Sequence, residues 1–441
     1  MLAATMTSVI KTLMFIFIWS PDCNGQCLGN KSVVEVKSSI KDSLRYCIAD
    51  CLELTEDEAE EKCVFNTITG KIKGCDSVRS RKESKFKIIC YFDYDVNIST
   101  LVIENGQPLC DILILSVAAF NKDTNLLEMK TERWSKEISA MRVAKKLGMK
   151  VTLRVGSWDE SIMHPREFTR VAKNEQLTAI FVKGVTELVR KYNFDGITIA
   201  WMWPGCPQSS CILNVDRKTV SSFLRALATP FKVNGKIVVY HMYGVFMSII
   251  MAVGDYFSEI VDEIDYFYFE DHFQSGEWMP KTDLNFNLKE TRDLMDELMT
   301  KIKRAKDFRR KVVISMEPSY PSFELRGQKV LKIGTIFVPN SKMTKLLKMS
   351  EWCELTKDPA YQLVKNAETQ NYAIKSDNIF MFDDQESLTA KVNFVMEFGA
   401  GVGLHNLVPD DVNGECGCGK MPYLKLIFNT LKMDCEPIPC F

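Results

Sequence analysis

The sequence lacks an excess of charge of either sign, and it lacks a membrane-length apolar run. Its 56 basic and 57 acidic residues give a net charge of −1 over 441 residues. Nucleic-acid-binding proteins gather basic residues on one surface, so this balance argues against a nucleic-acid partner. No stretch reaches the roughly 18 consecutive apolar residues that a membrane-spanning helix needs. We expect no nucleic-acid partner and no membrane partner.

Metal-binding motifs are also scarce. The chain has four histidines, none at helical HxxxH spacing, and none of its 15 cysteines belongs to a CxxC pair. The pair Cys416-Gly-Cys418 does not by itself supply the four ligands of a structural zinc site. We therefore predict no metal and no cofactor.

The first 25 residues are typical of a secretory signal. A short segment ending at Lys11 precedes the apolar run 13–19, and Pro21 follows it. Cleavage after Gly25 would remove Cys23 and leave fourteen cysteines, an even number that fits disulfide pairing in an extracellular protein. Sequons at Asn30 and Asn97 agree with a secreted glycoprotein. The alternative, a retained membrane anchor, is disfavoured because the apolar run is too short.

Residues 26–84 differ from the rest of the chain. Segment 39–54 has helical spacing, and Thr55 with Glu58 resembles a capping box that opens a second helix ending at Cys63. We predict a small helical extension stapled by disulfides and joined to the rest by a basic linker. A partner-binding module and a stabilising wrap both remain open. Its five cysteines are Cys27, Cys47, Cys51, Cys63 and Cys75.

From residue 85 to residue 441 the pattern changes to short apolar runs that alternate with amphipathic helical stretches. Near-continuous runs of β-branched and aromatic residues indicate strands buried on both faces. Eight such units predict a (β/α)8 TIM barrel of the α/β class. The segment 323–384 is too long for one helix and its loops, so we expect an α+β insertion between strands seven and eight. The runs are 86–92, 111–120, 150–156, 196–202, 236–242, 265–271, 311–318 and 401–408.

The fourth run decides the family that the chain resembles. Residues 191–205, KYNFDGITIAWMWPG, resemble the signature DGxDxDxE, followed by an aromatic residue and proline, of family-18 chitinases. Asp195 and the WPG segment 203–205 match this pattern. Thr198, Ala200 and Met202 do not, because they stand where the family has Asp, Asp and Glu.

Further segments resemble the same family in the same order. Residues 155–168 resemble its third-strand GGW segment, 382–401 its DDxxSxxxK helix and 410–417 its DDxxGxCG tail, with most likeness to arthropod members. The resemblance implies disulfides Cys90–Cys110 and Cys353–Cys416. Cys206 and Cys211 are expected to close their own loop after strand four.

The resemblance also says what the three departures mean. Family-18 enzymes cleave N-acetylglucosamine polymers by a substrate-assisted route, in which the strand-end glutamate protonates the leaving oxygen. Met202 has no proton to donate, and Thr198 and Ala200 remove the carboxylates that stabilise developing positive charge. Alternate residues of a strand face one side, so all three losses fall in one pocket. We expect no hydrolase activity and no catalytic residue at these positions.

Other polar residues are expected to occupy the pocket. Ser319 stands at the pocket tyrosine and His405 at the floor tryptophan, while strand parity points Glu270 and His272 inward and gives Glu317 the parity of Ser319. We interpret them as polar residues that fill the space left by the lost motif; the alternative is a metal-ligand or acid/base site. Aromatic platforms for stacking on a sugar remain at Trp158, Trp203 and Trp278.

Three hypotheses follow. The first is a secreted chitinase-like protein that binds chitin, an N-acetylglucosamine oligosaccharide or an unknown protein without hydrolysis. The second is a repurposed enzyme or metal site that uses Glu270, His272 and His405. The third is a structural or regulatory secreted protein that binds no sugar and uses its cysteine-rich extension as a contact surface.

Overall fold

The computed structural model divides the chain into two compact units, residues 1–85 with 428–437 and residues 86–427 with 438–441. No helix among the described residues is long and apolar enough to cross a membrane. The residues that the structure describes are 64–65, 72–73, 86–92, 95–103, 106–116, 118–128, 132–156, 163–201, 217–243, 256–270, 287–324, 343–365 and 370–432.

Eight parallel strands close into a barrel in the order β10-β11-β17-β3-β4-β7-β8-β9. The predicted (β/α)8 barrel is confirmed: seven of the eight predicted runs contain one of its strands, and the run 236–242 ends one residue before β9 does. Strands β8 and β11 are buried at every position, as expected for strands covered on both faces. The strands are β3 Ile88–Tyr91, β4 Ile112–Ser116, β7 Lys150–Val155, β8 Gly196–Ile199, β9 Ile237–Tyr243, β10 Tyr266–Glu270, β11 Val312–Met316 and β17 Gly401–Leu404.

One predicted run is wrong in its extent. The run 111–120 is two strands, because β4 ends at Ser116 and β5, Ala119–Asn121, pairs with β6, Leu126–Glu128, as an antiparallel hairpin. Apolar residues continue across the break because Phe120 and Leu127 of the hairpin are buried. A continuous apolar run therefore does not mark where one strand ends and the next begins.

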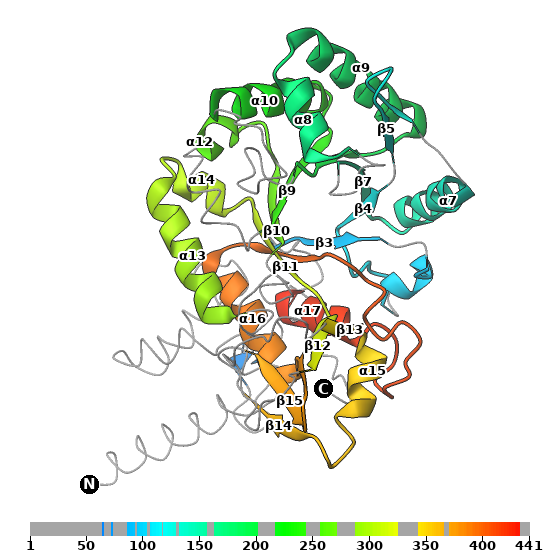
Figure 1. Cartoon of the computed structure of the whole chain (residues 1–441), viewed down its shortest axis with the longest axis vertical. Coiled ribbons are helices and arrows are strands. Elements are labelled where there is room, and N and C mark those ends of the chain that lie inside the picture. The colour runs from blue at the N-terminus through cyan, green and yellow to red at the C-terminus, as the bar shows by residue number, and fades with distance from the viewer. Residues whose placement is uncertain are drawn as a thin grey trace. The chain divides into compact units, whose positions relative to one another are not determined.

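The helices lie outside the ring of strands (Figure 1). Helix α9 shows how the sequence sets their limits. The side chain of Asn174 accepts a hydrogen bond from Leu177 N at the start of α9, and Asn193 ends the helix in the left-handed conformation. The helices are α7 Glu132–Lys146, α8 Pro165–Ala172, α9 Glu175–Tyr192, α10 Arg217–Val233, α12 Phe257–Ile260, α13 Leu288–Lys301, α14 Ala305–Arg309, α16 Gln385–Phe398 and α17 Pro422–Lys432.

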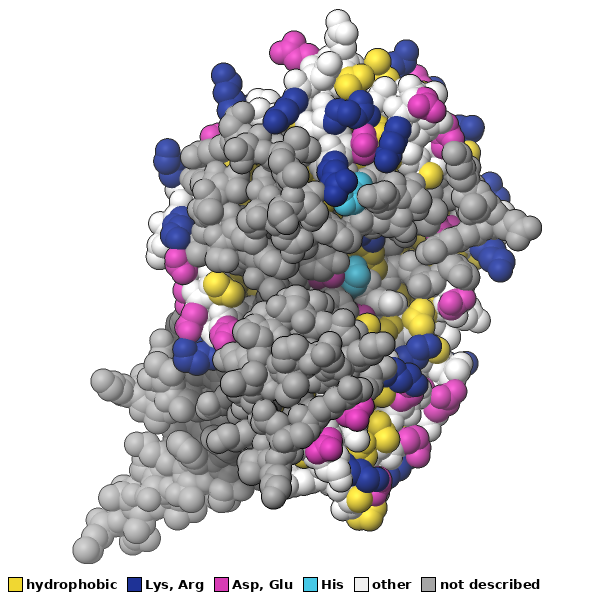
Figure 2. Space-filling model, in the orientation of Figure 1, with side chains coloured by type: hydrophobic (Ala, Val, Ile, Leu, Met, Phe, Trp, Pro, Cys, Tyr) yellow, Lys and Arg dark blue, Asp and Glu magenta, His cyan; other side chains and the backbone are white. Residues whose placement is uncertain are grey.

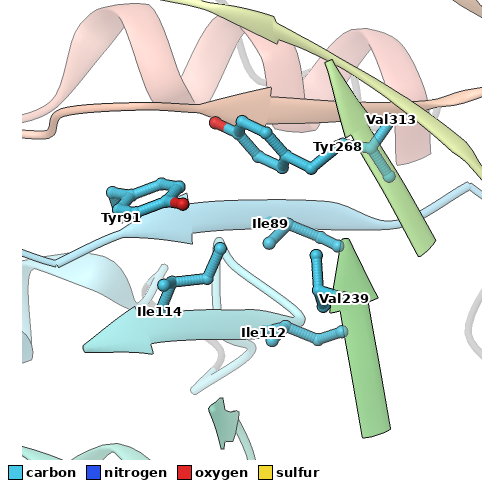
Figure 3. Close-up of a cluster of buried hydrophobic side chains, with 7 residues drawn as sticks. All are labelled: Ile89, Tyr91, Ile112, Ile114, Val239, Tyr268 and Val313. Atoms are coloured by element: carbon cyan, nitrogen blue, oxygen red, sulfur yellow. The ribbon is translucent and has the colours of Figure 1, made fainter. Parts of the chain in front are cut away.

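The inside of the barrel is filled by a cluster of buried side chains, drawn in Figure 3. Tyr268 projects from β10 into this space, where a Cβ atom at Gly403 would lie 2.3 Å from its ring. Gly403 is therefore needed for the tyrosine to fit. The cluster closes the barrel beneath the carboxyl ends of the strands. Its members are Ile89, Tyr91, Ile112, Ile114, Val239, Tyr268 and Val313.

A repeated aspartate contact fastens strand pairs at the opposite end of the barrel, where the strands begin. Asp111, Asp195 and Asp265 each precede a strand and each accept a backbone N–H from the neighbouring strand, at 2.8, 2.9 and 2.8 Å. Each also pairs with a lysine side chain. Ala400 takes the equivalent position between β11 and β17, so the fourth strand pair lacks this contact.

The segment between β11 and β17 forms an antiparallel sheet of order β13-β12-β16-β15-β14. The predicted α+β insertion is confirmed, although its sheet begins at Tyr320 rather than at 323. Tyr320 is buried and pairs with Leu347, so the chain enters this sheet directly after the barrel strand. The elements are β12 Tyr320–Glu324, β13 Met343–Leu347, α15 Met349–Leu355, β14 Gln362–Val364, β15 Asn371–Lys375 and β16 Asn378–Phe382.

Two disulfides are formed among the described residues as the family resemblance implies. Cys90 pairs with Cys110, and Cys353 of α15 pairs with Cys416, which follows β17. Cys418 is also disulfide-bonded. In the extension, β1 (Val64–Phe65) and β2 (Ile72–Lys73) pair antiparallel, a ladder that its helical pattern does not predict. The two helices expected there lie outside the described residues.

Candidate functional site

Six polar side chains gather where the barrel strands end. Each strand residue among them follows an inward-facing residue by two positions, as His241 follows Val239 and Glu270 follows Tyr268. They therefore lie at the carboxyl-end side of the buried cluster of Figure 3, and Tyr91 belongs to both groups. We call these six residues the mouth cluster. They are Tyr91 of β3, Arg154 of β7, His241 of β9, Glu270 of β10, Glu317 just after β11 and His405 just after β17.

A hydrogen-bonded chain of three residues crosses the cluster. The Tyr91 hydroxyl bonds to Nδ1 of His241, and Nε2 of His241 lies 2.6 Å from Oε2 of Glu270. His241 and Glu270 are fully buried. Both ring nitrogens of His241 have a partner when the phenol donates to Nδ1 and the Nε2–H donates to Oε2 of the carboxylate. Such pairing is what makes a buried carboxylate tolerable.

The environment of Tyr91 keeps its hydroxyl protonated. Burial raises the pKa of Tyr91 well above its usual value, and the Glu270 carboxylate raises it further. Arg154 opposes this effect, with its guanidinium carbon 5.3 Å from the centre of the Tyr91 ring. Burial wins, so Tyr91 acts as a hydrogen-bond donor at neutral pH and not as an anionic nucleophile.

Beyond Glu270, the line of contacts continues to His405 and then to Glu317, and His405 is the most exposed of these three residues. Its Nε2 lies 3.4 Å from Oε2 of Glu270, and its Nδ1 lies 4.0 Å from Oε2 of Glu317. Its side chain is 22% exposed, whereas the Glu270 and Glu317 side chains are 0% and 5% exposed. His405 thus lies between two buried carboxylates and the solvent. The same oxygen of Glu270, Oε2, therefore lies near the Nε2 atoms of both His241 and His405.

Neither Thr198 nor Ala200, at the carboxyl end of β8, carries an ionisable side chain. Thr198 and Ala200 are fully buried, and the Thr198 hydroxyl lies 2.8 Å from the hydroxyl of Thr152 on the neighbouring strand β7. Asp195 lies at the other end of the same strand, where it pairs with Lys145 at 3.1 Å and accepts the Val151 N–H. Asp195 therefore holds strands together and does not face the mouth.

The structure brings together three of the predicted site residues, Glu270, Glu317 and His405. Tyr91 and Arg154 were not among the residues predicted from the sequence. Arg154 had a readable signal, since it is a charge in the interior of the apolar run 150–156, whereas Lys150 stands at its start. Of the four histidines of the chain, His164 is not in the mouth cluster; it is the N-cap of α8, where its Nδ1 accepts the Arg166 N–H. Met202, Trp158, Trp203, Trp278, His272, Cys206, Cys211 and Asn30 lie outside the described residues.

The mouth cluster does not have the arrangement of a metal site. Within the part of the chain that the structure describes, no group of three or more His, Cys, Asp or Glu residues is placed to hold a metal ion. The reason is the hydrogen bonding, because Nε2 of His241 points at a carboxylate oxygen instead of sharing a metal with it.

On the face shown in Figure 2, described basic and acidic side chains are mixed, with no large patch of one sign.

Comparison with known proteins assigns this barrel to a family. The model of the glycosyl hydrolases family 18 matches residues 87–410. The chain belongs to glycosyl hydrolase family 18. The match spans all eight barrel strands, from β3 to β17, and it includes the insertion and the whole mouth cluster. The site is therefore the carboxyl-end mouth of a family-18 barrel.

Curated relatives carry chitinase names. The chain is 24% identical over 383 residues to "Probable chitinase 10" of Drosophila melanogaster, covering 79% of this chain but 16% of that protein. It is 24% identical over 358 residues to "Endochitinase" of Brugia malayi, covering 76% of this chain and 69% of that protein.

Solved structures show the same fold. Catalytic domain 2 of the Ostrinia furnacalis Group II chitinase matches with a TM-score of 0.69 and 21% identity, over 81% of this chain and 99% of that one. Human YKL-39, described as a pseudo-chitinase with retained chitooligosaccharide binding properties, matches with a TM-score of 0.62 and 16% identity, over 78% and 99%.

Proposed function

We propose that this family-18 protein is a secreted, arthropod-type chitinase-like protein that binds a chitin-like glycan at the barrel mouth without cleaving it. One observation carries the proposal. The end of β8 presents Thr198, bonded to Thr152, and Ala200, and neither side chain can act as an acid or stabilise a cationic transition state. The sequence places Met202 next on the same face.

Glu270 is a poor substitute for the missing acid. A general acid needs a proton and must reach the leaving oxygen at hydrogen-bond distance. Glu270 is fully buried, and its Oε2 is already engaged by His241 at 2.6 Å. An oxygen held in this way is not positioned to reach a leaving oxygen.

Binding without hydrolysis has a precedent in the same fold. YKL-39 is described as a pseudo-chitinase that retains chitooligosaccharide binding. Secretion is supported by the signal-like N-terminus and by the disulfides, which persist in oxidising compartments. The exposed Asn97, whose sequon Ser99 bonds to its side chain, is available for glycosylation. The Drosophila and Ostrinia relatives support the arthropod type.

The test combines turnover and binding on the purified full chain. We expect no cleavage of chitooligosaccharides or fluorogenic N-acetylglucosaminides above the buffer rate, together with saturable binding of a chitin-type oligosaccharide in calorimetry. Met202→Glu alone should not restore cleavage, because Thr198 and Ala200 still leave the developing charge unstabilised. Turnover that disappears in Glu270→Gln would instead establish a repurposed enzyme.

A further inference from the structure

We infer that the glycan held at the barrel mouth carries an anionic substituent, a carboxylate or a sulfate ester, and that Arg154 binds this substituent. The inference rests on the proposed function and names the class of glycan. It starts from a guanidinium group at the mouth that forms no ion pair with any residue that the structure describes.

Arg154 projects into the barrel from β7. Its guanidinium carbon lies 5.3 Å from the centre of the Tyr91 ring, which belongs to the cluster inside the barrel (Figure 3). The strand register agrees, because Thr152 of β7 is paired with Ile114 of the same cluster, and Arg154 follows Thr152 by two positions. Arg154 is half-buried, so solvent reaches part of this permanent positive charge.

The protein supplies no acceptor for this guanidinium. Nε of Arg154 is buried without a hydrogen-bond partner. The two terminal nitrogens are accessible, and within the described part of the chain neither has an acceptor. The face of the Tyr91 ring attracts the charge but leaves the N–H donors free. A partly desolvated cation without acceptors is unfavourable, and an anionic group on a ligand would supply what is missing.

The carboxylates of the mouth do not occupy this position. Glu317 follows β11, which is four strands from β7 in the closed ring of eight, and Glu270 ends β10, which is three strands from β7. Their side chains are 5% and 0% exposed, whereas that of His405 is 22% exposed. Of these three side chains, a ligand therefore meets mainly the imidazole of His405, while Arg154 faces it from β7.

The shape of the guanidinium indicates which group it binds. Its N–H donors form a rigid, planar fork that matches two oxygens of one anionic group. An acetamide is neutral and offers a single carbonyl oxygen, so it satisfies this fork less well. A neutral chitin-type chain would leave donors of Arg154 unpaired, whereas a carboxylate or a sulfate ester on the same backbone would pair with them.

Calorimetry with three matched ligands tests the inference. The full chain is titrated at neutral pH with the tetramer of N-acetylglucosamine, with the same tetramer oxidised to carboxylates at C6, and with its 6-O-sulfated form. We expect at least one acidic tetramer to bind about tenfold more tightly than the neutral one, the effect of one added charge-assisted hydrogen bond. The tighter of the two acidic tetramers identifies the anionic group.

Variants separate Arg154 from general attraction between charges. Arg154→Gln removes the charge and the fork, so the advantage of the acidic tetramer should disappear while the affinity for the neutral tetramer stays unchanged. Arg154→Lys keeps the charge without the fork and should lose part of the advantage. Arg190→Gln is the matched control and should change neither affinity, because Arg190 is exposed in the last turn of α9, which precedes the start of β8. Thermal melts check folding, and Arg154→Lys keeps the inference testable if Arg154→Gln does not fold.

The outcomes distinguish this inference from the proposed function. Equal or tighter binding of the neutral tetramer overturns the inference and leaves glycan binding intact. A preference for the acidic tetramer that survives Arg154→Gln, or that falls equally in Arg190→Gln, also overturns it. Binding of none of the three tetramers removes the proposed function as well.

Discussion

Glu270 is fully buried, and the residues around it show how the protein accommodates a carboxyl group there. His241 donates to it at 2.6 Å, and Tyr91 in turn bonds to His241. In a low-dielectric interior such a chain is favourable only when every member is satisfied. Removing one member therefore leaves a buried polar group of its neighbour without that partner, which destabilises the folded state.

Tyr91→Phe tests this dependence. The change removes one oxygen and leaves Nδ1 of His241 without the Tyr91 donor, so we expect the free energy of unfolding to fall by about 1–3 kcal/mol. Tyr361→Phe is the control, since the Tyr361 ring packs against Phe380 away from the mouth. Chemical denaturation of both variants measures the difference. Equal stability of the two would show that the Tyr91 contact contributes nothing net.

A second buried carboxylate, Asp410, predicts a pH dependence of stability. It accepts hydrogen bonds from the backbone N–H of the next residue, Asp411, and from the N–H groups of Tyr423 and Leu424 at the start of α17. These bonds favour the charged form, but burial outweighs them and raises the pKa of Asp410 to about 7. The folded state thus binds this proton more tightly than the unfolded state. The stabilisation is complete below about pH 4 and is lost as pH rises to about 7.

Asp410→Asn removes this titration and keeps an acceptor oxygen. The difference in unfolding free energy between the natural chain and the variant should shift in favour of the variant from pH 4 to pH 7. The change should be about 1.4 kcal/mol for each unit by which the pKa is raised. Urea unfolding at a series of pH values measures it. A difference that stays constant with pH would contradict the raised pKa.

At the scale of strands and helices, the sequence predicts this fold well because buried parallel strands have a simple signature. All eight runs of β-branched and aromatic residues overlap a barrel strand. Boundaries are less readable, since burial of Phe120 in a separate hairpin hides the end of β4. The start of the insertion is hidden as well, because Tyr320 is buried although it pairs with Leu347 in the sheet of the insertion and not in the barrel. Local pattern reports burial, while tertiary pairing decides which sheet a residue joins.

For the candidate site too, the sequence predicts part of the arrangement and not the rest. Strand parity predicts that Glu270 and Glu317 meet near His405, and the distances show that they do. Parity says nothing of partners across the barrel, which is why Tyr91 and its bond to His241 were missed. Closure of the ring brings β3 and β9 to face each other, and no local feature of either strand carries that information.

The aspartates that fasten strand pairs allow a prediction at this scale. Asp195→Ala removes the ion pair with Lys145 and the acceptor for the Val151 N–H. We expect a loss of about 1–3 kcal/mol in the free energy of unfolding, with oligosaccharide affinity unchanged because Asp195 lies at the end of β8 opposite the mouth. Asp265→Ala, at the equivalent position before β10, should behave alike. A selective loss of binding in Asp195→Ala would place Asp195 in the binding site.

For the whole molecule, the open question is how the cysteine-rich extension is joined to the barrel, and the cysteines give an answer that can be tested. Cys90, Cys110, Cys353 and Cys416 are accounted for by two disulfides, and Cys418 is bonded as well. The predicted Cys206–Cys211 loop and signal cleavage leave Cys418, Cys435 and Cys440 with the five cysteines of the extension. Five is odd, so full pairing requires at least one bond from the extension to this C-terminal group.

We therefore expect a disulfide that links residues 27–75 to Cys418, Cys435 or Cys440. Such a bond would restrict the extension in the folded protein and close a loop of several hundred residues in the unfolded chain, a stabilisation of about 6 kcal/mol in the chain-entropy description. Peptide mapping without reduction identifies the linked peptides, and mapping after reduction is the control. Pairs confined to residues 27–75 with one free thiol there would show instead an extension joined to the barrel by its linker alone.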